Sequence, residues 1–181
     1  MKNLSFVLRL SLTLLAITSV VALVLAGVNS ITAPLIQAHQ QQKIQQAMEQ
    51  VLPGAENLQE LSFEDATNTV EKLWKGDIGY VVQVAPNGFG GAFVMMVGVN
   101  NDGTVAGISV VSHSETKGLG SVMAENTAVG QAFRDQFVGL DGELAADKDG
   151  GQIDAITGAT ISTRAVVSGV NAALQCIKNL G

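Results

Sequence analysis

The stretch that most limits the fold is an uncharged apolar run near the N-terminus, "LSLTLLAITSVVALVLAGV", from Leu10 to Val28. Its length of about 19 residues is what an α-helix needs to cross the hydrocarbon core of a bilayer. Hydroxyl side chains such as Thr13 and Thr18 are tolerated in such a helix because they can bond to its own carbonyl groups. The run therefore predicts a transmembrane helix over residues 10–28.

The charges on either side of this run predict its orientation. Lys2 and Arg9 precede it, whereas the first formal charge after it is Lys43 and the first acidic residue is Glu49. Basic residues flanking a span stay in the cytoplasm. We expect residues 1–9 in the cytoplasm and the acidic body outside, on the periplasmic side of the inner membrane.

A cleaved signal peptide is the alternative interpretation of the run. Its apolar core would be shorter and would be followed by a site of the Ala-x-Ala type. The following segment, "LAGVNSITAP", offers a poor site, and "LAG" lacks the cysteine that a lipoprotein requires. We therefore expect a retained single-pass anchor.

Composition limits the chemistry of the body. The net charge of −6 gives no basic surface for nucleic acid. The single cysteine, Cys176, excludes an internal disulfide and a cysteine-based zinc site. The two histidines, His39 and His113, lie far apart in the chain, so we assign no metal site and no catalytic residues.

The body after the span divides into a stalk and a globular domain. Residues 30–51 predict a helix with Pro34 in its first turn, and Pro53-Gly54 ends the stalk, residues 29–53. From residue 54 to 181 the pattern predicts an α+β domain, an antiparallel sheet packed by helices. The expected strands are Thr69–Trp74, Gly79–Pro86, Gly91–Val99, Thr104–His113 and a brief one at Gly151–Ile156; the expected helices are Glu125–Phe137 and Ile161–Leu180.

The segment "DAITGATIST", Asp154–Thr163, stands at the start of the last helix. Thr160 suits the N-cap position, where a hydroxyl accepts a backbone hydrogen bond, and this interpretation needs no function. A helix N-terminus also attracts anions, so the hydroxyls of Thr157, Ser162 and Thr163 could surround a phosphate. The spacing alone leaves both interpretations open.

Two glycine-containing loops are further candidates. "SHSETKGLG", Ser112–Gly120, follows a strand, and "NGFGGA", Asn87–Ala92, precedes one. Each is either a solvated turn or a loop whose backbone approaches a flat ligand closely. The second loop is a weak match to a phosphate-binding loop, because a strand follows it where a helix should begin.

Taken together and in this order, the anchor, "GFGG", "SHSETKGLG" and "DAITGAT" resemble a known family. The chain is similar over nearly its whole length to the FMN-binding subunits of ion-pumping respiratory complexes. These are the G subunit of the Rnf complex and the C subunit of the sodium-translocating NADH:quinone reductase. The most specific motif of the family, Asp-x-x-Ser/Thr-Gly-Ala-Thr, is filled by Asp154, Thr157, Gly158, Ala159 and Thr160.

This resemblance implies a covalent flavin. In the family the final threonine of the motif, here Thr160, carries FMN through a phosphoester bond made by a dedicated flavin transferase. In the loop motif, usually Glu-Thr-Pro-Gly-Leu-Gly, Lys117 replaces the proline. The other residues that we assign to the cofactor site are Gly90, Gly91, Glu115, Thr116, Gly118, Leu119, Gly120, Asp154, Thr157, Gly158, Ala159, Ser162 and Thr163.

The short chain favours the Rnf G subunit, because the quinone-reductase subunit tends to carry insertions. The resemblance then implies an electron relay between ferredoxin and NAD, coupled to sodium or proton movement, with the other subunits of the complex as partners. Three alternatives stay open. They are the C subunit, a membrane regulatory flavoprotein of the same fold, and a non-redox binding module in which Thr160 is only a helix cap.

Overall fold

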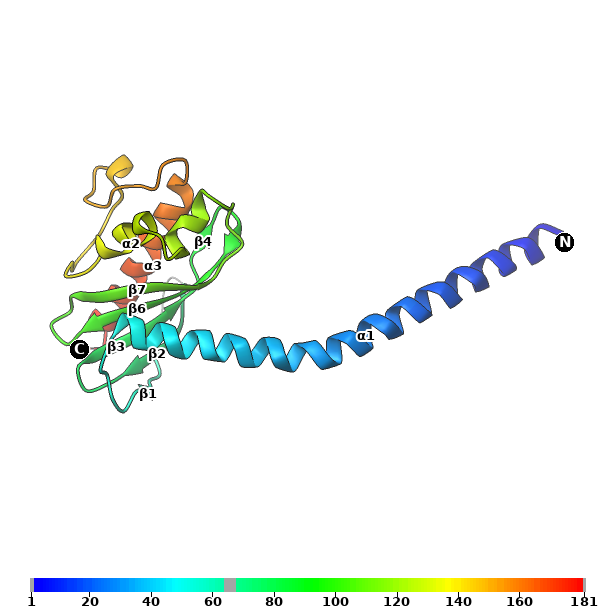
Figure 1. Cartoon of the computed structure of the whole chain (residues 1–181), viewed down its shortest axis with the longest axis horizontal. Coiled ribbons are helices and arrows are strands. Elements are labelled where there is room, and N and C mark those ends of the chain that lie inside the picture. Colours follow the sequence, from blue (N-terminus) through cyan, green and yellow to red (C-terminus); the bar gives the residue numbers. More distant parts are fainter. Residues whose placement is uncertain (1, 64–67, 181) are drawn as a thin grey trace. The chain divides into compact units, whose positions relative to one another are not determined.

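The computed structural model describes residues 2–63 and 68–180 and divides into two compact units, Met1–Gln42 and Lys43–Gly181. Helix α1 (Lys2–Val51) makes up the first unit and continues into the second (Figure 1). Thr13 Oγ1 donates to the carbonyl of Arg9 at 2.8 Å and Thr18 Oγ1 to that of Leu14 at 3.0 Å. Among the described residues this is the one helix long and apolar enough to cross a membrane.

Helix α1 has no break between the predicted span and the predicted stalk. Pro34 lies inside it and not in the first turn of a second helix, so that expectation is wrong. Proline removes one backbone donor from a helix. The hydroxyls of Ser30 and Thr32, just before the proline, donate to the carbonyls of Gly27 and Val28 at 2.8 and 3.0 Å. The helix continues past Pro34 to Val51.

The second unit is built on an antiparallel five-stranded sheet of order β1-β2-β3-β6-β7 (Figure 1). The strands are β1 (Gln59–Glu60), β2 (Val70–Lys75), β3 (Gly79–Val84), β6 (Val94–Asn100) and β7 (Val105–Ser112). The four longer ones confirm predicted strands, and β6 and β7 are joined by the predicted turn around Gly103, whose φ is +89°. The α+β fold is thus confirmed.

Both faces of the sheet are buried. Consecutive residues of the central strands are apolar, and successive side chains of a strand point to opposite faces. Val82, Val97 and Ile108 lie side by side across three strands and face helices α2 (Ala128–Asp135) and α3 (Thr160–Lys178). Val81 and Met96 point to the opposite face, where the end of α1 packs. The domain therefore has three layers: the end of α1, the sheet, and the pair α2 and α3.

Two glycines allow the end of α1 to lie directly on the sheet. Gly98 and Gly107 are cross-strand neighbours on β6 and β7. A Cβ atom on Gly98 would overlap the backbone carbonyl of Val51, and one on Gly107 would lie 3.3 Å from it. The last turns of α1 are thus part of the domain core.

Three predicted elements differ from the structure. The expected strand Gly151–Ile156 is irregular, because Ile153 forms only an isolated bridge to Ala146. The expected helix Glu125–Phe137 is shorter, since Thr127 caps α2 by accepting from the amide of Gly130. The expected strand Gly91–Val99 is split: β4 (Asn87–Gly88) and β5 (Gly91–Ala92) form a separate hairpin before β6 begins.

Candidate functional site

The β4–β5 hairpin carries the "GFGG" motif. Gly88 pairs with Gly91, so Phe89 and Gly90 form its two-residue tip, and Phe89 is 69% exposed. Gly91 has a φ of +104°, which suits glycine in this turn. The amide of Gly90 points inward and donates to Glu115 Oε1 at 3.1 Å.

Glu115 is the residue on which the three motifs meet. Its side chain is buried, and its Oε2 accepts a hydrogen bond of 2.7 Å from the hydroxyl of Ser162 in the first turn of α3. Its backbone amide donates to Nδ1 of His113 at 3.2 Å. No lysine or arginine within the described ranges forms an ion pair with this carboxylate.

Glycines surround the Glu115 carboxylate because there is no room for side chains. A Cβ atom on Gly88 or Gly120 would overlap the carboxylate oxygens, and one on Gly90 would overlap the carbonyl of Ser114. Four residues enclose the acid, and we call them the Glu115 socket: Gly88, Gly90, Gly120 and Ser162. It joins the hairpin, the loop and α3, so the three predicted segments come together in space (Figure 1).

Helix α3 begins at Thr160, one residue earlier than the predicted cap requires. Ala159 occupies the N-cap position and makes no side-chain cap bond, so the expectation that Thr160 is the N-cap is wrong. Thr163, one turn inside the helix, closes the turn instead. Its hydroxyl accepts from the amide of Ile156 at 3.1 Å and donates to the carbonyl of Ala159 at 3.1 Å. Thr163 is fully buried and has a structural role.

Thr160 is left accessible by this arrangement. It is half-buried, and across residues 2–63 and 68–180 its hydroxyl has no hydrogen-bond partner. In the same described part of the chain, the amides of Thr160, Ile161 and Ser162 also bond to no protein group, as at most helix starts. The site thus offers a nucleophile-type hydroxyl beside free N–H donors.

The turn before α3 presents the rest of the motif. Gly158 has a φ of +75°, and the amide of Ala159 donates to the carbonyl of Ile156 at 2.9 Å. Thr157 and Gly158 are exposed. The backbone of Asp154 is fixed by Gln136, whose Oε1 accepts from the Asp154 amide at 2.7 Å, while the Asp154 side chain is exposed.

The loop Glu115–Gly120 lies against this turn. Leu119 Cδ2 is 3.1 Å from where a Cβ atom of Gly158 would stand. Gly118 has a φ of +76° and faces open space, and its amide donates to Ser121 Oγ at 2.8 Å. Thr116 and Lys117 are exposed. Three partly exposed apolar side chains, Phe89, Leu119 and Ile161, stand one on each of the motif segments.

Sequence reasoning missed three residues of this region. Gly88, His113 and Gln136 make the contacts described above. Gly88 stands in "GFGG" and His113 in "SHSETKGLG", whereas Gln136 lies in no motif. At Gly120 the sequence predicted close approach of the backbone to a ligand's ring or chain. In the structure the groups packed closely against Gly120 are the side chains of Glu115 and Ser162.

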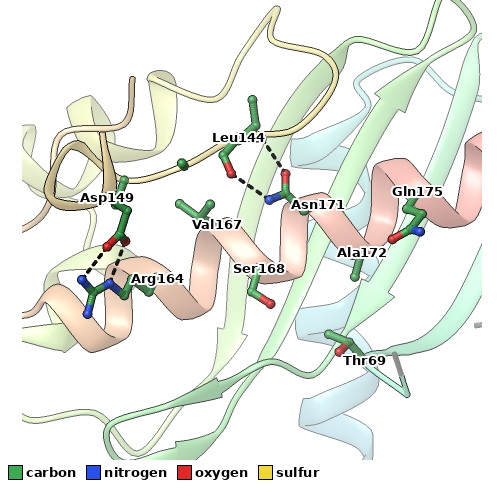
Figure 2. A pocket seen from close by; sticks show the side chains of 11 residues that line it. Thr69, Leu144, Asp149, Arg164, Val167, Ser168, Asn171, Ala172 and Gln175 are labelled. Carbon is green, nitrogen blue, oxygen red and sulfur yellow. Dashed lines mark hydrogen bonds and ion pairs between the residues drawn. The ribbon is translucent and has the colours of Figure 1, made fainter. Parts of the chain in front are cut away.

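A separate hollow of about 320 Å³ runs along α3 (Figure 2). Arg164, Val167 and Asn171 line it from the helix, opposite Leu144 and Asp149. Arg164 lies four residues after Thr160, hence on the same side of α3. It binds Asp149 through two hydrogen bonds of 2.6 and 2.7 Å, which lower the pKa of Asp149 and raise that of Arg164.

Comparison with known proteins identifies the class. Residues 88–175, which contain the hairpin except Asn87, the Glu115 loop and most of α3, match the FMN-binding domain. Residues 1–51 match the RnfG N-terminal region, and α1 forms residues 2–51 of this match. The fold and the site therefore define a membrane-anchored protein with an FMN-binding domain.

The relatives identify the family. The chain is 32% identical to the G subunit of the ion-translocating oxidoreductase complex of Methanosarcina acetivorans, over 93% of each chain. It is 30% identical to the corresponding subunit of the Na⁺-translocating ferredoxin:NAD⁺ oxidoreductase complex of Acetobacterium woodii (96% of this chain, 93% of the relative). For the proton-translocating complex of Clostridium ljungdahlii the identity is 31% (96% and 92%). The chain belongs to the family of Rnf complex G subunits.

Proposed function

We propose that this chain is the flavoprotein subunit of an ion-translocating ferredoxin:NAD oxidoreductase and relays electrons through FMN esterified to Thr160. The observation that carries the proposal is the convergence of the three motif segments on the Glu115 socket, beside the accessible hydroxyl of Thr160. The subunit has no complete active site of its own in this proposal, and the other subunits hold the nicotinamide chemistry.

The residues around Thr160 fit the phosphate of FMN. The amides of Thr160, Ile161 and Ser162 point out of the first turn of α3, where the positive end of the helix dipole favours an anion. The exposed hydroxyl of Thr157 adds a further donor within the motif. These backbone and hydroxyl donors would hold the ester without a charged side chain.

The loop and hairpin would hold the flavin ring. Leu119, beside Gly158, and Phe89, at the hairpin tip, offer apolar surface to a flat ring. When bound, FMN supplies one- and two-electron transfer, and the protein positions it and tunes its potential. Glu115 keeps both segments in register with α3, because each of its oxygens is bonded to a different segment.

We also propose that residues 1–9 are cytoplasmic, that the FMN domain lies outside the inner membrane, and that a flavin transferase attaches the cofactor there. The support is Lys2 and Arg9 before the span, and the acidic domain after it. A covalent tether suits that location, because FMN lost outside the cytoplasm could not be replaced from the cell's pool.

The test is in-gel flavin fluorescence of the denatured full-length chain from its native host. Thr160→Ala should abolish the fluorescence, while Thr157→Ala, changed in the same exposed turn, should retain some. Neither hydroxyl is needed by the fold, since in the part of the chain that is described neither makes a hydrogen bond. Undiminished fluorescence in Thr160→Ala would place the ester elsewhere. Intact mass should show one FMN-sized addition in the wild type, and its absence would favour the plain binding module.

A further inference from the structure

The two edges of the sheet differ in how well they are protected. β1, at one edge, has two residues, and Glu60 places a charge there, 3.9 Å from Lys72. β7, at the other, has eight residues, "VAGISVVS", without a charge or a proline. Long, uncharged edge strands are pairing sites that proteins normally blunt or cover. The β7 edge therefore needs a cover.

Among the described residues, backbone hydrogen bonds pair only the first residue of this edge. Val105 accepts from the amide of Gly139 and donates to the carbonyl of Leu140, both at 2.8 Å. From Ala106 to Ser112, the described residues supply one strand partner, β6, and no backbone partner on the other side. In an antiparallel strand alternate residues direct their N–H and C=O groups outward, so about three residues present unpaired groups.

A hollow of about 370 Å³ runs along this open edge. Its lining includes five consecutive residues of β7, Ala106–Val110. Alternate residues of a strand point to opposite faces, so an unbroken run of five lines a hollow only if the hollow follows the strand's edge. We call it the β7 groove. Its far wall is α2, through Gln131, Arg134 and Asp135, and five residues of strand are about 17 Å long.

The chemistry of the groove selects a neutral, extended polypeptide. Arg134 and Asp135 are neighbours of opposite charge, so the wall carries no net charge. Three side-chain amides, those of Gln50, Asn126 and Gln131, offer both donors and acceptors. A second copy of this chain fits poorly, because α2 flanks the open edge of β7 and would keep the β7 edges of two copies apart. An unfolded tail or loop of another subunit meets no such obstacle.

We propose that the β7 groove binds an extended, uncharged segment of a neighbouring subunit of the complex, which adds a sixth strand beside β7. The main-chain groups of β7 would supply the hydrogen bonds, as in other cases of strand addition. β7 runs directly into the loop that carries Glu115. The segment would therefore dock this subunit next to its candidate cofactor site. The proposal rests on membership of the complex and not on the flavin at Thr160.

Hydrogen exchange tests whether the edge is covered. The full-length chain in detergent is compared with the same chain in the purified complex. Amides in peptides covering 106–112 should exchange at least about tenfold more slowly in the complex, since pairing protects them. Equal exchange in both samples would overturn the proposal. Protection already present in the isolated chain, and lost on dilution, would also overturn it, because it would identify a second copy as the occupant.

Cross-linking tests the occupant. A photo-reactive residue at Gln131, in the groove wall, should form an adduct with a segment of another subunit. The same residue at Val129, exposed on α2 but outside the groove, should not. Gln131→Trp should fill the groove and return exchange over 106–112 to the isolated-chain rate, while Val129→Trp should leave the protection unchanged. No adduct at Gln131, or equal adducts at both positions, would overturn the proposal.

Discussion

Glu115 and Asp149 both hold the start of α3, the first from inside the domain and the second from its surface. Glu115 is 8% exposed and bonds to Ser162 and Gly90, both uncharged groups. Asp149 is exposed and bonds twice to Arg164, one turn further along the helix. An exposed ion pair contributes little, because water screens it. Buried polar groups are costly once their partner is removed. Glu115, which is buried and bonded only to uncharged groups, should therefore contribute more to the stability of the fold than the Asp149–Arg164 ion pair.

The largest effect is expected for Glu115→Ala. It would leave the Ser162 hydroxyl and the Gly90 amide without their acceptor and create a cavity in the Glu115 socket. The free energy of unfolding should fall by about 2–4 kcal/mol, and flavin attachment should fall with it. Thermal unfolding of the full-length chain in detergent measures the first effect. Glu115→Gln, which keeps one carbonyl acceptor, should lose less; an alanine variant as stable as the wild type would contradict a central role for the socket.

The next largest effect is expected for Gly120→Ala. Its new methyl group would overlap both the Glu115 carboxylate and the Ser162 hydroxyl, so one of them must move. Such overpacking costs about 1–3 kcal/mol. Gly118→Ala is the matched control in the same loop. It has open space around it and only its positive φ to accommodate, for about 1 kcal/mol. Comparing the unfolding midpoints of the two variants checks this, and a larger loss in Gly118→Ala would argue against the tight socket.

A smaller effect is expected for Asp149→Asn, and it should depend on pH. Arg164 lowers the pKa of Asp149 in the folded state. The ion pair therefore stabilises the fold fully above the unfolded pKa of about 3.9 and loses its contribution as the pH falls through the lower folded value. Wild type and variant should differ slightly at pH 7 and less at high salt. The difference should shrink as the pH falls through the lowered folded pKa of Asp149. Unfolding measured across this pH range tests it; a difference that persisted in acid would point to a role other than charge.

The smallest effect is expected for Lys117→Glu, which extends the comparison from stability to the cofactor. Lys117 is exposed, so the change should leave the unfolding midpoint unaltered. A cation near the ring favours the anionic reduced flavin, so its reversal should lower the midpoint potential of the flavin. The shift should be small, since water and salt screen the charge. Redox titration of the full-length chain measures it, and a raised potential would place Lys117 away from the ring.

The predictions from the sequence that were right are those that depend on residues close together in the chain. Alternating strands, the turn at Gly103 and the membrane-spanning length of α1 are local patterns, and the structure contains all three. The predicted strand at Gly151–Ile156 was wrong because a strand requires a partner, and only Ile153 finds one, in a single bridge. Pro34 was misplaced because proline favours the first turn of a helix, whereas α1 runs through this proline without ending.

The sequence by itself determined the order of the elements, the anchor and the three motif segments, because these depend on residues close together in the chain. Only the tertiary structure decided that the segments meet on one buried carboxylate. Nothing in "SHSETKGLG" indicates that Glu115 points inward while Lys117 points out. That difference arises from contacts across 25 residues to Gly90 and 47 residues to Ser162, which come together only when the sheet and α3 have packed.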